Sequence, residues 1–153
     1  MSGPALGLQA LAVGGGAAIG ALLRWLAGLW LNAQWNGFPL GTLLVNCVGG
    51  FMVGIALVWF TRSPDEMLRL LVVTGFLGGL TTFSAYSVES LVLLQRGLWG
   101  LAAAHTLAHV GGALACAVLG FAVARTALGW ALAAPDVGVA FADLDQAAAR
   151  PAA

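Results

Sequence analysis

Residues 75–87 read GFLGGLTTFSAYS and lie in the middle of a long apolar run. The stretch combines adjacent glycines with threonines and serines. Glycine lowers helix stability by about 1 kcal/mol relative to alanine, and β-branched threonine adds a smaller penalty. Inside a membrane, non-helical backbone is tolerated only where protein buries it or where it lines a cavity. The stretch therefore predicts a helix broken at the membrane midplane. The alternative is a kinked helix whose hydroxyls bond to the preceding turn.

The composition around this stretch indicates an integral membrane protein. Of 153 residues, 61% are hydrophobic and 8% are charged, and the mean hydropathy is +0.96, whereas soluble domains carry about 25% charged residues. The net charge is zero and the arginines are scattered, which argues against a nucleic-acid partner because such a partner needs a basic patch. Cys47 and Cys116 fall inside apolar runs, so we expect no disulfide framework. The first ten residues lack a basic segment, so we expect no cleaved signal peptide.

Four apolar windows are each long enough to cross a bilayer, which takes roughly 20 residues. They lie at about 8–30, 40–60, 68–94 and 99–124. Turn signals and charges separate them, and Ser63 or Asp65 is placed to cap the third helix. We therefore predict an all-α membrane domain of four transmembrane helices over residues 1–126. The polar residues 127–153 are expected to form a disordered tail.

Small residues spaced four apart recur in the predicted helices. Gly16 and Gly20 form one such pair, and Gly50 and Gly54 form another; such pairs let helices approach closely in lipid. Packing within one chain and packing between copies explain them equally well. A bundle of four helices encloses little space, so we expect a homo-oligomer. The few arginines favour one orientation only weakly, which is compatible with insertion both ways.

Three segments resemble the CrcB/Fluc family of bacterial fluoride channels, and they read GGGAAIGALLRW, GTLLVNCVGG and GGLTTFSAYS. The resemblance covers roughly residues 10–124 and all four predicted helices in order. It implies a passive channel in the bacterial plasma (inner) membrane that exports fluoride from the cytoplasm and so lowers its toxicity. It also implies an antiparallel, dual-topology homodimer with two fluoride pores and a central structural Na⁺. A second, oppositely oriented paralogue is the alternative partner.

The resemblance also assigns site residues position by position. The carbonyls of Gly78 and Thr81 match those that hold the sodium ion. Asn46 matches the pore asparagine, and Thr42 joins the fluoride pathway because it lies one helical turn earlier on the same face. The other residues assigned to this pathway are Arg24, Phe83, Ser84, Tyr86, His105 and His109. Tyr86 stands where the family has a second phenylalanine, and the two histidines stand where it has a tyrosine and a serine.

The chemistry of these residues independently suits a small anion. The Asn46 amide and the neighbouring hydroxyls donate hydrogen bonds without carrying a full charge. The positive edge of the Phe83 ring can also face an anion. Donors of this kind bind weakly enough for the ion to leave again. The residues alone therefore indicate a small anion, and the resemblance indicates fluoride.

Several of these residues have a plainer interpretation. Phe83 is of a type that more often packs than lines a pore, and Asn46 is able to join helices by hydrogen bonding. Arg24 is able to extend to the membrane interface instead of attracting anions. Glu89 lies well inside the third window, where it would sit at a vestibule or pair with an arginine.

His105 and His109 are one helical turn apart and so share a face. Because unperturbed imidazole titrates near pH 6.5, we expect fluoride flux to vary between about pH 5 and 8. The direction of that change is left open, and the alternative is that both rings only pack. A metal transporter would also use such a pair, although two imidazoles alone make an incomplete site.

Other classes fit less well. A proton-coupled small multidrug transporter would need a carboxylate in the first helix, which has Arg24 and no acid. A non-transporting scaffold would explain the glycines but not the polar cluster in the third helix. The sequence has no nucleophile–base or phosphate-loop signature, so we do not expect an enzyme.

Overall fold

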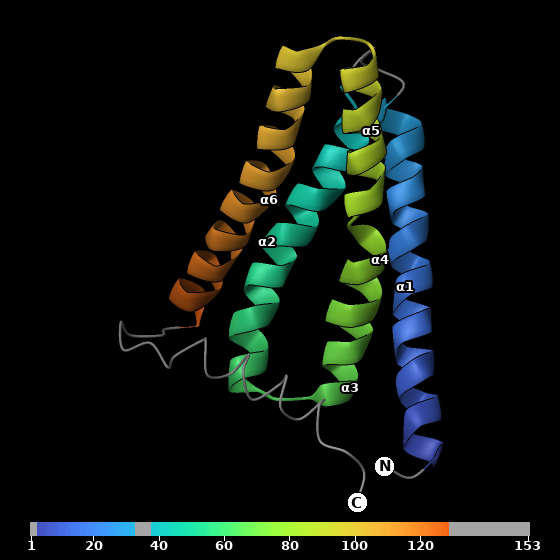
Figure 1. Cartoon of the computed structure of the whole chain (residues 1–153). Helices are drawn as coiled ribbons and strands as arrows, with labels where there is room; N and C mark the ends of the chain where they lie inside the picture. The colour runs from blue at the N-terminus through green and yellow to red at the C-terminus, as the bar shows by residue number, and fades with distance from the viewer. Residues whose placement is uncertain (1–2, 33–37, 129–153) are drawn as a thin grey trace, which may run out of the picture.

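The computed structural model describes residues 3–32 and 38–128, and Figure 1 shows the arrangement of the helices. In chain order these are α1 (Gly3–Leu31), α2 (Leu40–Arg62), α3 (Glu66–Arg69), the π-helix η2 (Leu70–Leu77), α4 (Gly78–Leu80), α5 (Phe83–Gln95) and α6 (Trp99–Ala127). The elements from α3 to α5 follow one another directly and make up one long segment. The disordered tail is predicted over residues 127–153. Of these, residues 129–153 lie outside the described part of the chain.

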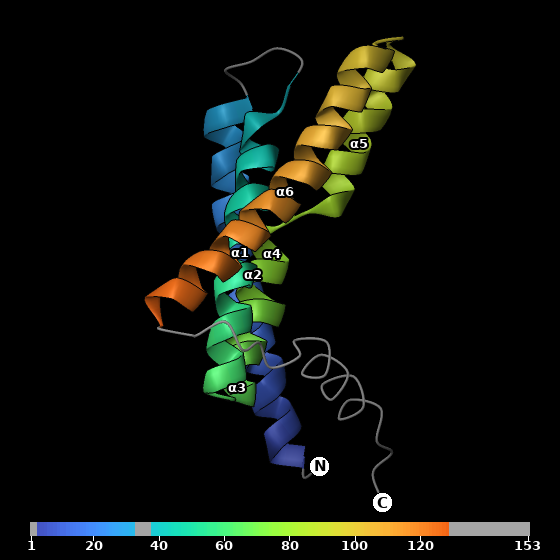
Figure 2. The ribbon, with the colours of Figure 1, turned by 90° about the vertical axis from the view of Figure 1, so that its left-hand side faces the viewer.

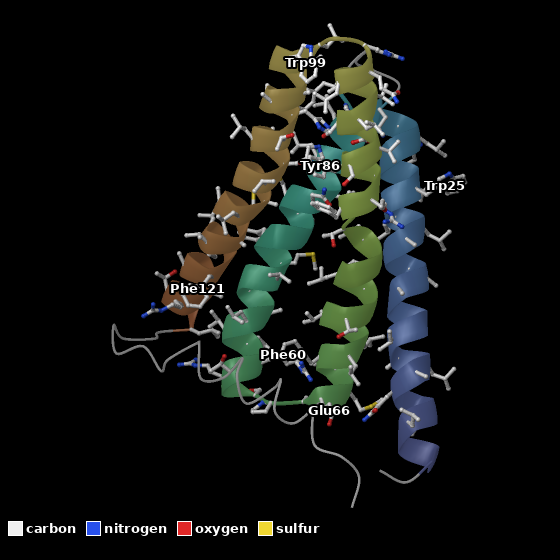
Figure 3. The ribbon with its side chains drawn as sticks, in the orientation of Figure 1. Trp25, Phe60, Glu66, Tyr86, Trp99 and Phe121 are labelled. Carbon is white, nitrogen blue, oxygen red and sulfur yellow. The ribbon has the colours of Figure 1, made fainter. Side chains whose placement is uncertain are left out.

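Within the described residues, four helical segments are long and apolar enough to cross a membrane. They are Leu6–Leu31, Leu40–Arg62, Glu66–Gln95 and Trp99–Ala127. Each contains one of the predicted windows, so the all-α fold with four spanning helices is confirmed. Large apolar side chains face outward along these helices: Trp25 is 60% exposed and points away from the bundle (Figure 3). Such an extensive apolar surface is expected where the surrounding solvent is lipid.

The long third segment changes its packing partner partway along. Its first part, η2 and α4, packs against α1, whereas α5 packs against α6. Figure 2 shows α5 leaving the direction of α4 and running beside the first half of α6. α2 lies between these two pairs and packs mainly against α6. The small apolar core is centred on Val45, Leu77 and Leu80.

Glycines make the closest helix contacts. An added Cβ on Gly16 or Gly20 would approach a backbone nitrogen of η2 or α4 to 2.7 Å. An added Cβ on Gly50 would approach a backbone oxygen of α6 to 2.5 Å, and one on Gly54 would approach a backbone nitrogen of α6 to 2.6 Å. All of these distances are too short for a real Cβ, so only glycine allows these helices to pack. Packing within one chain thus accounts for both predicted glycine pairs.

The start of the third segment agrees with the predicted cap. The Asp65 carboxylate accepts a hydrogen bond from the backbone N–H of Leu68 at 2.9 Å. This satisfies one of the N–H groups that lack an intrahelical partner at the start of a helix. Of the two candidates, Asp65 is therefore the capping residue.

We predict that Gly16→Val destabilises the protein by about 1–3 kcal/mol, because the added side chain meets the backbone of η2, which cannot rotate away. Gly15→Val is the matched control, since no atom lies within 4 Å of its Cβ position. Thermal unfolding of the purified protein in detergent measures the difference. Equal unfolding temperatures for the two variants would contradict the packing described above.

Candidate functional site

The site is built around Thr81 and Thr82, which join α4 to α5. Both residues have extended backbone, with φ −80° and ψ 156° for Thr81 and φ −150° and ψ 122° for Thr82. The Thr81 hydroxyl donates to the carbonyl of Leu77 at 2.9 Å, so one hydroxyl does bond back to the preceding turn. The Thr82 hydroxyl accepts from the backbone N–H of Ala85 at 3.1 Å. Thr82 is thus the N-cap of α5, a position that threonine favours.

Asn46 of α2 supplies hydrogen bonds to the backbone of Thr82. Its Oδ1 accepts from the Thr82 N–H at 2.8 Å, and its Nδ2 donates to the Thr82 carbonyl at 3.0 Å. In a continuous α-helix that N–H would bond to the carbonyl of Gly78. Asn46 therefore takes the place of a helical partner and holds α2 against the junction.

Arg24 of α1 reaches the same junction from the other side. Its Nη1 donates to the Thr81 carbonyl at 3.3 Å. The guanidinium is partly buried at this contact, so Arg24 does not simply extend to the membrane interface. It supports the extended backbone between α4 and α5.

The buried polar side chains of the described residues gather in one region next to this junction. They are Thr42, Thr82, His105 and His109, and none is more than 7% exposed. Burying polar groups is costly unless they are hydrogen-bonded. A concentration of such groups in an otherwise apolar bundle marks the candidate functional site.

Glu89 and His105 form the centre of this cluster. The Thr42 hydroxyl donates to Glu89 Oε1 at 2.6 Å, and Glu89 Oε2 lies 3.4 Å from His105 Nε2. On the other side of the ring, His105 Nδ1 lies 3.0 Å from the Ser90 hydroxyl. Glu89 therefore pairs with a threonine and a histidine, whereas the sequence left a vestibule position or an arginine partner open.

Tyr86 covers the two histidines. Its ring stacks on His105 with 5.5 Å between the centroids and an interplanar angle of 15°, and it lies 5.1 Å from the His109 ring. Figure 3 shows Tyr86 in the upper half of the molecule, where α5 approaches α6. Phe83 lies beside Tyr86, with 5.2 Å between the ring centroids, but its side chain is 76% exposed.

A groove of about 470 Å³ opens next to the cluster. Its lining includes Asn46, Gly78, Thr81, Phe83, Tyr86 and His109. The groove thus brings together four of the eight predicted pathway residues, namely Asn46, Phe83, Tyr86 and His109, with both predicted sodium ligands. Ser84 is set apart, since its hydroxyl contacts Thr82 Oγ1 at 3.2 Å and its side chain is exposed.

Two residues of the cluster had no assigned role from the sequence. Thr82 was only part of the Thr-Thr pair, and its capping role depends on where α5 begins. Ser90 was not singled out, although a serine following Glu89 inside an apolar window is a polar signal. The contact between His105 and Ser90 arises only from the packing of α5 against α6, so the sequence alone does not predict it.

Long apolar helices with a buried polar cluster between them define a multi-pass helical membrane protein. Residues 11–121 match the family described as CrcB-like protein, Camphor Resistance (CrcB). The chain belongs to this family, which confirms the resemblance seen in its motifs.

Similar proteins from several bacteria carry the name fluoride-specific ion channel FluC. The one from Aromatoleum aromaticum is 52% identical over 109 residues, covering 70% of this chain and 83% of that protein. The one from Thiobacillus denitrificans is 50% identical over 105 residues, covering 67% and 85%. The one from Pseudomonas paraeruginosa is 50% identical over 111 residues, covering 71% and 87%.

Proposed function

We propose that the protein is a fluoride-specific ion channel, and not an enzyme, that lets fluoride leave the cytoplasm and so lowers its toxicity. The observation that carries this proposal is the group of buried polar side chains, Thr42, Thr82, His105 and His109, beside a groove that Asn46, Tyr86 and His109 line. Family membership supports the proposal, and the fluoride selectivity named for the relatives identifies the ion. The membrane is taken to be the bacterial plasma membrane.

The pathway follows the groove along α2, α5 and α6. Both N–H groups of the Asn46 amide are taken by contacts within the protein, so His109 and the hydroxyl groups nearby supply the donors that replace part of the hydration of a small anion. Phe83 presents its ring at the surface of the groove, where the positive edge can face the ion. The nearest arginine, Arg24, bonds to the Thr81 carbonyl. An ion in the groove is therefore held mainly by dipoles, which favours release as well as binding.

A metal transporter is the second candidate, and one observation favours it. Glu89, His105 and His109 each place a possible ligand atom within 4.8 Å of the others. The sequence alone offered two imidazoles, and the structure adds a carboxylate to them. Two histidines and a carboxylate are a donor set that suits zinc. Efflux of fluoride against that of a divalent cation separates the two candidates.

The assembly is proposed to be an antiparallel homodimer in which the groove of one subunit is covered by the other. Phe83 supports this arrangement, because an aromatic side chain that is 76% exposed next to a polar groove suits a partner surface. The junction at Thr81 and Thr82 would then lie near the middle of the membrane. A paralogous subunit in the opposite orientation would fill the same role.

A structural Na⁺ at the centre of this dimer is proposed to bind the carbonyls of Gly78 and Thr81. The residues fit such an ion. The N–H that would bond to the Gly78 carbonyl in a continuous helix donates instead to Asn46, and the Thr81 oxygen, which accepts from Arg24, has a second lone pair. Carbonyl oxygens are ligands that hard cations prefer. When bound, the ion would neutralise the carbonyl dipoles of the two junctions.

We predict that Phe83→Ile and Asn46→Asp each lower fluoride efflux from proteoliposomes at least tenfold. The first removes the aromatic edge, and the second replaces a donor with a charged acceptor. Phe60→Ile is the matched control, because Phe60 lines a separate hollow between α2 and η2. Chloride efflux from the same vesicles checks selectivity. Wild-type fluoride efflux from both site variants would remove these residues from the pathway.

We predict that both orientations occur in equal amounts in the membrane. In a chain with Cys47 and Cys116 changed to serine, one cysteine is introduced either at Ser63 or at Gln95. The two positions lie at opposite ends of the helix bundle, so labelling at each shows which side of the membrane that end faces. An impermeant thiol reagent added to intact cells should label about half of the molecules at either position. Labelling of all molecules at one position and none at the other would contradict the dual topology.

We predict that Gly78→Val weakens the dimer while each subunit still folds. Within one subunit, the nearest atom to a Cβ at Gly78 is a carbonyl oxygen 3.8 Å away, so the side chain meets an obstacle only where a second subunit approaches. Cross-linking in membranes and thermal unfolding together measure the two effects. An unchanged dimer, still stabilised by Na⁺, would place the ion and the interface elsewhere.

A further inference from the structure

The hydrogen bonds of Asn46 determine which way its amide group faces. The Thr82 N–H can only donate and the Thr82 carbonyl can only accept, so Oδ1 must face the former and Nδ2 the latter. Nδ2 also lies 3.2 Å from His109 Nδ1. An amide NH₂ group has no acceptor, so His109 Nδ1 must accept this bond. In a neutral imidazole, the proton is then on Nε2.

His109 Nε2 has no hydrogen-bond partner among the described residues, although the side chain is only 3% exposed. A buried donor left without a partner is destabilising, because it has lost its hydrogen bonds to water without gaining one in the protein. Two further atoms share this condition, His105 Nε2 and Glu89 Oε2. They lie 3.4 Å from each other, whereas no comparable neighbour from the described part of the chain faces His109 Nε2. This buried N–H therefore lacks a hydrogen-bond acceptor, and an acceptor that reached it would be bound favourably.

We propose that Asn46 is a positioning residue that holds His109 in the Nε2–H form, and that this N–H donates a hydrogen bond to fluoride in the groove. The inference rests on the proposed fluoride pathway and assigns it a specific donor. The His109 ring lines the groove together with Asn46, Phe83 and Tyr86. Tyr86 packs against the ring at 5.1 Å, which limits its rotation.

The same tautomer disfavours a metal ion at this position. A metal bound to His109 Nε2 needs the lone pair of that nitrogen, so the proton would move to Nδ1. Nδ1–H would then face the NH₂ group of Asn46, and two donors facing each other cannot form a hydrogen bond. Asn46 cannot reverse its amide group without losing both bonds to Thr82. Within the three-residue cluster that resembles a zinc site, His109 is thus oriented to donate a hydrogen bond and not to bind a metal ion.

The experiment is ¹⁵N NMR of histidine-labelled protein in lipid bilayers. The chain has only two histidines, so His105→Gln leaves His109 as the only imidazole. We expect a protonated Nε2 and an unprotonated Nδ1, and a shift of the Nε2 resonance on addition of fluoride but not of equal chloride. Asn46→Asp should move the proton to Nδ1, because a carboxylate only accepts. Ser90→Ala, which removes a contact of His105 only, is the matched control and should leave His109 unchanged.

A protonated Nδ1 in the His105→Gln protein would overturn the proposal, and so would a tautomer that stays the same when Asn46→Asp is added. If His105→Gln does not fold, the wild-type spectrum minus that of His109→Gln gives the same assignment. If zinc, and not fluoride, shifts the ¹⁵N resonance of His109 Nε2, the result would favour the metal site and would also overturn the proposal.

Fluoride efflux provides a second, independent measurement. Asn46→Asp should lower efflux at least fivefold more in the presence of His109 than in the His109→Gln background, since the two residues act as a coupled pair. Equal losses in both backgrounds would count against the coupling. If the wild type shows no fluoride efflux, the proposed function fails; if efflux is present but the tautomer is the other one, only the present inference fails.

Discussion

Buried backbone that leaves the helical conformation must find other partners for its N–H and C=O groups within the protein, and the structure is organised around how Thr81 and Thr82 meet this requirement. Arg24 donates to the carbonyl of Thr81. Asn46 bonds to both backbone groups of Thr82. The partners come from α1 and α2, so the junction also ties three segments of the chain together.

The change of direction at this junction decides where the polar residues meet. α4 remains against α1, while α5 turns to pack against α6. This brings Glu89 of α5 within 3.4 Å of His105 of α6 and within hydrogen-bond distance of Thr42 of α2. A straight third helix would have kept one partner along its length. The glycine contacts of α1 and α2 hold the other helices close enough for the cluster to be buried.

The cluster combines burial with incomplete hydrogen bonding. Most of its polar atoms have hydrogen-bond partners. Glu89 Oε2, His105 Nε2 and His109 Nε2 have no hydrogen-bond partner among the residues that the structure describes, although the first two lie 3.4 Å apart. In a folded protein, buried polar groups without partners are few and usually have a functional reason. The proposed fluoride pathway gives His109 Nε2 such a reason, because an anion in the groove would accept its hydrogen bond.

The sequence alone determined the membrane class, the four helices and the family, because hydrophobic length, turn residues and the GGLTTFSAYS motif are local properties. The sequence also predicted that Asn46, Tyr86 and His109 belong to one site, from their positions in the family pattern, and the structure places all three in the lining of one groove. Only the tertiary structure decided that the glycine pairs pack within one chain, since a small residue on a helix does not reveal what faces it. The pairing of Glu89 with Thr42 and His105, and the choice of tautomer at His109, likewise depend on contacts between residues 47, 16 and 63 positions apart. Such distances and hydrogen-bond directions are set by how the helices pack, and no local pattern in the chain records them.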